Sequence, residues 1–176
     1  MIKRVIHTTA DFDYADNLVF SEDATTVARE VLKQGARIVT DTQMAKSGIN
    51  KKAIAQLGCE LHCFIGLDEV AKIAKDKGCT RASAAVDRAI ETLEKPVIFV
   101  VGNAPTALIR VHEWITDHEY SPALIIAVPV GFVNVVESKE LVLSSRIPHI
   151  VAKGQKGGSN VAAAICNALL YEIAER

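Results

Sequence analysis

The sequence predicts an α/β protein with a single doubly wound, mainly parallel sheet and helices on both faces. Short runs of apolar and β-branched residues alternate with helical patterns along the whole chain, and the connections between them are short. Residues 124–128 are continuous in Leu, Ile and Val, which is typical of a parallel strand buried on both faces. With 176 residues, 49% of them hydrophobic, we expect residues 1–176 to form one domain.

The expected elements alternate in order along the chain. Strands are predicted at residues 3–9, 36–40, 60–65, 97–101, 124–128 and 147–151. Helices are predicted between Ser21 and Gly35, in 41–48, 51–57, 68–77 and 80–93, after 103, and in 133–143 and 161–174. Ser21, Asp41 and Asn103 are expected to cap the helices that follow them, because short polar side chains accept from the first free N–H groups.

Composition and charge exclude several classes of protein. The formal net charge is −1, whereas a dedicated nucleic-acid binder needs a concentrated basic surface. The longest apolar run, residues 123–133, is too short to span a bilayer and contains Pro129 and Gly131. The first residues do not form a signal peptide. We therefore expect a cytoplasmic protein that binds neither nucleic acid nor membrane.

The four cysteines are too few and too scattered for the disulfide framework of a secreted protein. Cys59, His62 and Cys63 are candidate metal ligands by residue type. Residues 59–65, however, alternate like a buried strand, and no second ligand pair follows at zinc spacing. We expect these cysteines to pack as small apolar side chains and predict no metal site.

Polar or glycine residues follow several of the predicted strands. His7 stands at the end of the first, Asp41 follows the second, Asn103 the fourth and Gly131 the fifth. Because ligands bind outside the carboxyl ends of the strands in an open α/β sheet, these loops are expected to line one crevice. A histidine placed there can take up and release a proton near neutral pH.

Two further stretches suggest anion binding. Arg81 lies in the first turn of a predicted helix, where it is either a solvated surface charge or an arginine held for an anionic ligand. Residues 153–160, Lys-Gly-Gln-Lys-Gly-Gly-Ser-Asn, lack the order of a Walker loop, in which the lysine follows the glycines. Successive N–H groups, a lysine and a helix start nevertheless predict a nest for a carboxylate or a phosphate.

Taken together, a set of motifs resembles the precorrin-8X methylmutase family, also called cobalt-precorrin-8 methylmutases or precorrin isomerases. The most specific are Gly-Asn-Ala-Pro-Thr-Ala-Leu at 102–108 and Pro-Val-Gly-Phe-Val at 129–133. The others, in the same order as in the family, are Arg-Val-Ile-His at 4–7, Thr-Asp-Thr-Gln-Met at 40–44, Gly-Ile at 48–49, Thr-Arg at 80–81, Glu-Ser-Lys-Glu at 137–140 and Lys-Gly-Gly-Ser at 156–159.

The resemblance implies an isomerase of cobalamin biosynthesis. Such an enzyme moves a methyl group from ring carbon 11 to ring carbon 12 of precorrin-8X or cobalt-precorrin-8, giving hydrogenobyrinate or cobyrinate. It needs no cofactor, and cobalt, where present, travels with the substrate. The family's catalytic histidine falls on His7. A homodimer is what the family suggests.

The resemblance also implies a set of substrate-binding residues for a flat ring that carries many carboxylates. Arg4 and Arg81 are expected to meet carboxylates, and Asn50 stands where family members often have a small hydroxyl residue. Backbone donors are expected at Asn103, Gly131, Gly157 and Gly158. Gln155 departs from the family, whose members commonly have an arginine there.

The chain begins almost at the segment that carries His7, so we expect the domain to lack the N-terminal segment usual in the family. A protein that binds the corrin or tetrapyrrole without efficient turnover is therefore an alternative reading. A nucleotide-dependent enzyme is a weaker one, because no Gly-x-Gly-x-x-Gly pattern with a later acidic residue follows the first predicted strand.

Overall fold

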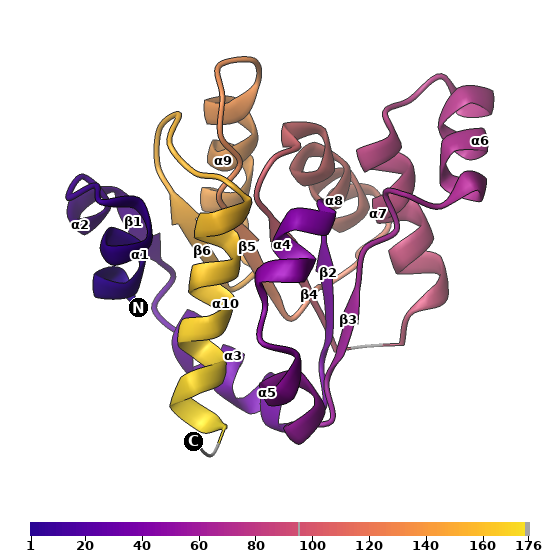
Figure 1. The fold of residues 1–176 in the computed structure, drawn as a ribbon. Coiled ribbons are helices and arrows are strands. Elements are labelled where there is room, and N and C mark those ends of the chain that lie inside the picture. The colour runs from indigo at the N-terminus through magenta and orange to yellow at the C-terminus, as the bar shows by residue number, and fades with distance from the viewer. Residues whose placement is uncertain (95, 175–176) are drawn as a thin grey trace.

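The computed structural model describes residues 1–94 and 96–174, which form a six-stranded sheet (Figure 1). The strands lie in the order β1-β6-β5-β4-β2-β3. Their bounds are β1 Leu18–Phe20, β2 Arg37–Thr40, β3 Glu60–His62, β4 Val97–Val101, β5 Leu124–Ala127 and β6 His149–Ala152. Strands β2 to β6 pair in parallel, and only β1 pairs antiparallel, with β6. The predicted mainly parallel α/β sheet is confirmed.

Helices cover both faces of the sheet (Figure 1). Their bounds are α1 Ile2–Thr9, α2 Tyr14–Asn17, α3 Ala24–Lys33, α4 Gln43–Gly48, α5 Lys51–Gln56, α6 Asp68–Lys77, α7 Arg81–Thr92, α8 Pro105–Asp117, α9 Val135–Leu143 and α10 Ser159–Ile173. Helices α1, α3, α4, α5 and α10 share one hydrophobic core, and α7, α8 and α9 share the other.

Strand β4 shows why two cores form. Its side chains alternate between the faces, as those of any strand must. Ile98 and Val100 enter the core beneath α10, whereas Val97, Phe99 and Val101 enter the core beneath α7 and α8. All five side chains are buried, so the strand is apolar on both faces.

Residues 3–9 are not a strand; the prediction was wrong, and they form helix α1. Val5 is fully buried in the core beneath α10, and Ile2 and Ile6 pack beside it. Apolar residues at positions 2, 5 and 6 follow helical spacing, which a run this short does not distinguish from a strand. The hydroxyl groups of Thr8 and Thr9 donate to the carbonyl groups of Arg4 and Val5, as helical threonines do.

The first strand of the sheet lies instead in β1, within a stretch that was not predicted as a strand. Its three residues pair with residues 150–152 of β6, and the Lys153 N–H donates to the Asn17 carbonyl at 2.8 Å beyond the pairing. A strand of three residues offers too little alternation to be recognised from sequence. It covers the edge of β6 and so closes one side of the sheet.

Two features of the structure concern disulfide bonds and membrane spans. All four cysteines are free thiols, and Cys79 alone among them is exposed. In residues 1–94 and 96–174, the helices are too short or too polar to cross a bilayer.

Candidate functional site

The loops after β2, β4, β5 and β6 converge, as predicted, at the carboxyl edge of the sheet. The loop after β2 reaches the loop after β4 through Asp41, and Thr42 Oγ1 lies 2.7 Å from Ser159 Oγ at the start of α10. The loop after β5 meets the glycine-rich loop after β6, since Gly131 N–H donates to the Gln155 carbonyl at 3.1 Å. One continuous network of hydrogen bonds thus joins the four loops.

Asp41 holds the turn after β4, rather than capping a helix as predicted. Its carboxylate accepts from the N–H groups of Gly102, Asn103 and Ala104 at 2.7–2.8 Å. Thr42 is the residue that caps α4, through its bond from Ala45 N–H. Burial raises the pKa of the Asp41 carboxyl, and the three donors, which favour its ionised form, offset only part of that effect.

The helix that follows this turn begins without a side-chain cap. The N-cap position of α8 is Ala104, not Asn103 as predicted, and it makes no side-chain cap bond. The Asn103 side chain remains exposed at the sheet edge. A carboxylate distant in sequence thus holds the turn before α8, and α8 begins without a side-chain cap.

We expect Asp41→Ala to lower the free energy of unfolding by about 3 kcal/mol or more, because three N–H groups lose their acceptor. Urea unfolding followed by circular dichroism measures the change. The matched control is Asp76→Ala on α6, which removes an exposed carboxylate and should shift the value by less than about 0.5 kcal/mol. Equal effects of the two substitutions would contradict this role of Asp41.

Lys139 is a buried lysine that supports the glycine-rich loop. It lies on α9 with 1% of its surface exposed, and its Nζ donates to the carbonyl groups of Gly154 at 2.7 Å and Lys156 at 2.9 Å. Burial lowers the pKa of Lys139 to about 8. Helical spacing from Val135 and Val142 does place position 139 on the buried face, which is the signal that the sequence reading missed.

The lowered pKa of Lys139 predicts a pH dependence of stability. Between about pH 8 and the ordinary lysine value of 10.5, the unfolded chain binds more protons at this group than the folded chain, so folding gains stability as the pH rises. Relative to Lys139→Met, the free energy of unfolding of the wild type should rise by about 2 to 3 kcal/mol over this window. Urea titrations at several pH values measure the two free energies of unfolding. If both change equally with pH, the prediction is wrong.

His7 lies in the last turn of α1 and is exposed. It is therefore at a helix end and not, as predicted, at a strand end. The segment just after it is tied to the glycine-rich loop: Lys156 Nζ lies 2.6 Å from Asp11 Oδ2 and 2.5 Å from Asp13 Oδ2. This lysine lowers the pKa of the Asp11 carboxyl. The ion pairs bring the end of α1 to the sheet edge where the loops converge.

Arg4 and Asn50 meet at one tyrosine of α10. The Arg4 guanidinium carbon lies 4.7 Å from the centre of the Tyr171 ring, and Asn50 Nδ2 donates to the Tyr171 hydroxyl at 2.9 Å. Asn50 Oδ1 also caps α5 by accepting from Ala53 N–H at 3.0 Å. The Asn50 side chain thus has clear structural partners, while Arg4 lies one helical turn from His7 on the exposed side of α1.

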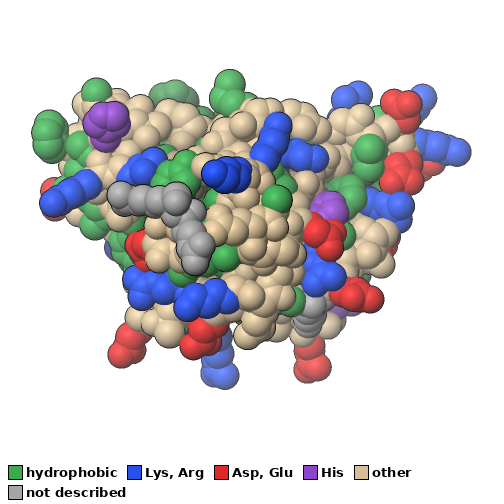
Figure 2. Space-filling view, turned by 60° about the horizontal axis from the view of Figure 1, so that its bottom comes forward, with side chains coloured by type: hydrophobic (Ala, Val, Ile, Leu, Met, Phe, Trp, Pro, Cys, Tyr) green, Lys and Arg blue, Asp and Glu red, His purple; other side chains and the backbone are tan. Residues whose placement is uncertain are grey.

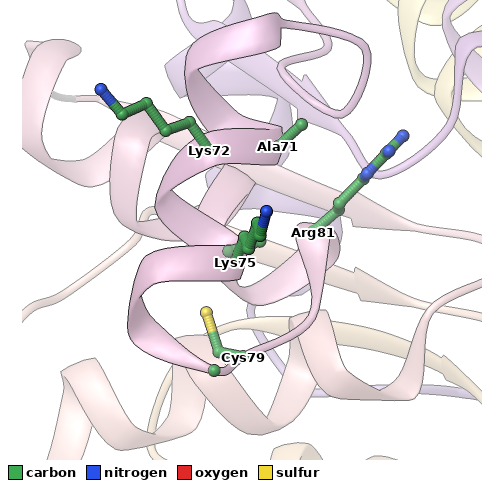
Figure 3. A pocket seen from close by; sticks show the side chains of 7 residues that line it. Ala71, Lys72, Lys75, Cys79 and Arg81 are labelled. Carbon is green, nitrogen blue, oxygen red and sulfur yellow. The ribbon is translucent and has the colours of Figure 1, made fainter.

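Arg81 is not brought near His7 within one chain. It begins α7, beyond the β2–β3 side of the sheet, whereas α1 lies beyond β6 (Figure 1). It lines a cavity of about 720 Å³ between α6 and α7, together with Lys72, Lys75 and Cys79. Lys72 and Arg81 extend in different directions there and do not converge on one point (Figure 3).

The predicted backbone donors are mostly engaged inside the chain. Asn103 N–H donates to Asp41, Gly131 N–H to the Gln155 carbonyl, and Gly158 N–H to the Val128 carbonyl at 2.8 Å. These three N–H groups hold the loops together and are not free for a ligand in this conformation. For Gly157 N–H, the described residues provide no acceptor.

Large exposed apolar side chains surround the converging loops, and the residue-by-residue reading of the sequence did not single them out. Phe132 is 83% exposed and Val133 78% in the loop after β5, Met44 is 70% exposed on α4, and Phe12 is 78% exposed after α1. The available signal was their position, since each follows a strand or helix end where no core remains to bury it. They offer an apolar surface to a flat ligand.

Charges of both signs alternate over the face of the molecule in Figure 2, in keeping with the net charge of −1. Within the described residues, no cluster of three His, Cys, Asp or Glu side chains is placed to hold a metal ion. Cys59 and Cys63 are buried, and His62 pairs with Glu60 at 3.0 Å. His62 is thus engaged in a hydrogen bond with Glu60 of the same strand.

Comparisons with known proteins cover nearly the whole chain. The family model for precorrin-8X methylmutase matches residues 1–172. The chain is 51% identical to the cobalt-precorrin-8 methylmutase of Salmonella typhimurium, covering 99% of this chain and 81% of that protein. It is 37% identical to the precorrin-8X methylmutase of Pseudomonas aeruginosa, over 96% of this chain and 81% of that protein.

A solved structure agrees with these sequence comparisons. The precorrin-8X methylmutase of Thermus thermophilus superposes with a TM-score of 0.90 at 37% identity, covering 98% of this chain and 84% of that chain. Both the fold and the sequence are therefore shared over the same residues that form the sheet and its loops. The chain belongs to the precorrin-8X methylmutase family.

Proposed function

We propose that this protein is an isomerase of cobalamin biosynthesis that moves a methyl group from ring carbon 11 to ring carbon 12 of precorrin-8X or cobalt-precorrin-8. The product is hydrogenobyrinate or cobyrinate. The observation that carries the proposal is the 51% identity, over 99% of this chain, to a cobalt-precorrin-8 methylmutase. Such a rearrangement changes no oxidation state, so the reaction needs no redox cofactor.

In this reaction His7 is the proton donor and acceptor. Protonation of the conjugated ring makes the migrating methyl group move toward an electron-poor centre, and the proton returns to the imidazole as the corrin chromophore forms. An exposed histidine beside the converging loops can reach a ring seated on them. This role fits the position of His7 at the end of α1, next to the Asp11 and Asp13 ion pairs.

The surroundings suit a flat ring with carboxylate arms. Exposed Met44, Phe132 and Val133 supply an apolar surface for the face of the macrocycle. Arg4 lies one turn from His7, and its guanidinium can pair with a carboxylate in two parallel hydrogen bonds. The site thus needs dispersed donors and little net positive charge.

The position of Arg81 favours a homodimer as the working form. Arg81 and His7 lie at opposite sides of one chain, so a second copy is the simplest way to bring both to one substrate. Sedimentation velocity tests the assembly. Mixing inactive His7→Ala with inactive Arg81→Ala chains should restore part of the activity if the site is shared. We also propose that the protein works in the cytoplasm, where its four free thiols would stay reduced.

The decisive experiment is to incubate the purified protein with precorrin-8X and with cobalt-precorrin-8 and to record absorption spectra over time. Conversion to the corrin spectrum supports the enzyme. Tight binding of either compound with an unchanged spectrum would overturn the proposal and favour a binding protein of the same fold. Comparing the two substrates also decides whether cobalt is present at this step.

A further inference from the structure

Three consecutive carbonyl groups of the glycine-rich loop point into the protein. Lys139 Nζ donates to the Gly154 carbonyl at 2.7 Å and to the Lys156 carbonyl at 2.9 Å. The carbonyl between them, on Gln155, accepts from Gly131 N–H at 3.1 Å. Residues from α9 and from the loop after β5 therefore hold the loop through three consecutive carbonyl groups.

The positions of these carbonyl groups also set the directions of the neighbouring N–H groups, because the trans peptide is planar. In each peptide unit, the carbonyl of one residue and the N–H of the next point in opposite directions. Since each of the three carbonyl groups is bonded to the protein, the N–H groups of Gln155, Lys156 and Gly157 point away from those partners. These three N–H groups find no acceptor in the part of the chain that the structure describes. Three successive outward N–H groups form a nest for an anion.

Lys139 contributes charge as well as shape. Its side chain is almost fully buried, and within the described residues its Nζ forms no ion pair with a carboxylate. A buried ammonium that meets only carbonyl groups is costly to the fold. An anion in the nest would lie across the loop from this ammonium and would compensate its charge.

We propose that Lys139 is the positioning residue of the substrate site: it turns the carbonyl groups of residues 154–156 inward, so that the N–H groups of residues 155–157 receive a carboxylate arm of the macrocycle. This inference rests on the proposed function and names the site for one arm. Lys139 touches the loop and not the substrate.

Asp11, Asp13 and Lys156 form a charged cluster beside the loop. Asp11 and Asp13 both lie against Lys156 Nζ, so that lysine is committed to them and is not a free ligand. Lys153 is exposed at the start of the loop. The backbone N–H groups, with the buried Lys139 behind them, must therefore supply the recognition.

The first test uses a commercial probe and the wild-type protein. Uroporphyrin I is a flat tetrapyrrole with eight carboxylates, and its binding is followed by fluorescence and by 15N–1H spectra of the protein. The amide signals of Gln155, Lys156 and Gly157 should shift on titration. Binding of the probe with these three signals unmoved would overturn the inference.

The second test compares substitutions. Lys139→Met should weaken the binding of uroporphyrin I by about tenfold or more, because the nest loses its shape and its charge. Lys139→Arg, which keeps charge and donors, should restore part of the affinity. The matched control is Lys153→Met, which removes the same charge beside the loop without touching its carbonyl groups and should alter the Kd by less than about threefold.

Turnover separates a positioning role from a purely structural one. With the natural substrate, Lys139→Met should raise KM by about tenfold while kcat changes much less, since the loop binds an arm and takes no part in the methyl shift. If Lys139→Met proves poorly folded, the wild-type amide shifts still decide the matter. Equal Kd values for Lys139→Met and Lys153→Met would contradict the inference.

Failure of this inference is distinguishable from failure of the proposed function. Conversion of precorrin-8X with unmoved loop amides would leave the isomerase standing and remove the nest. Shifted loop amides without any conversion would leave an anion-binding loop in a protein that is not an isomerase.

Discussion

His7→Ala is expected to lower kcat by about 10² to 10⁴-fold, the usual worth of a general acid–base group. Substrate affinity and the thermal midpoint should stay close to the wild-type values, because the imidazole is exposed on α1 and its removal leaves no cavity in the core. Stopped-flow spectra at saturating cobalt-precorrin-8 measure kcat, and fluorescence titration measures binding.

The matched control is His118→Ala, which removes an exposed histidine at the end of α8, beneath the other face of the sheet. It should turn over substrate at nearly the wild-type rate. An unchanged kcat in His7→Ala would exclude His7 as the proton donor, whereas a loss of binding without a loss of kcat would make it a substrate ligand only.

Gly157→Ala is expected to destabilise the fold strongly. A Cβ atom at this position would lie 2.1 Å from the Val128 carbonyl oxygen and 2.7 Å from that of Pro129. Both are backbone atoms, and the Val128 carbonyl also accepts from Gly158 N–H, so it cannot move without breaking the link between the two loops. We expect the free energy of unfolding to fall by about 3 kcal/mol or more.

Urea unfolding of Gly157→Ala measures this loss, with Gly66→Ala as the control. A Cβ atom at Gly66 would meet only the Gln43 side chain, at 3.8 Å, so that substitution should change the free energy by less than about 0.5 kcal/mol. If Gly157→Ala were as stable as Gly66→Ala, the close packing of the glycine-rich loop on the end of β5 would be disproved.

The class of fold followed from the sequence because its strongest signals are local. Residues 97–101 and 124–128 are apolar at every position, as strands covered on both faces must be, and both lie at the centre of the sheet. The convergence of the loops at Asp41, Asn103, Gly131 and the glycine-rich stretch followed from the same reasoning, since parallel strands end at a common edge.

The same reasoning failed for the segment around His7, where a strand was predicted and helix α1 is found. Its few apolar residues fit a strand as well as a helix, and only the burial of Val5 against α10 selects the helix. Similarly, the pattern predicted Asn103 as the cap of α8, whereas α8 has no side-chain cap and the Asn103 N–H donates to Asp41, which lies 62 residues earlier in the chain. Local patterns cannot report an acceptor that arrives from another strand.

By itself, then, the sequence determined the alternation of strands and helices, the common edge of the loops and the likeness to the methylmutases, all of which depend on local residue patterns. The tertiary structure alone decided which groups are free and which are engaged. In the folded chain, the N–H groups of Asn103, Gly131 and Gly158 donate to acceptors in other loops, and Lys139 donates to carbonyl groups of the glycine-rich loop. The partners in these hydrogen bonds are distant in sequence. Only the folded chain brings each donor to its acceptor, so only the structure shows which groups are engaged.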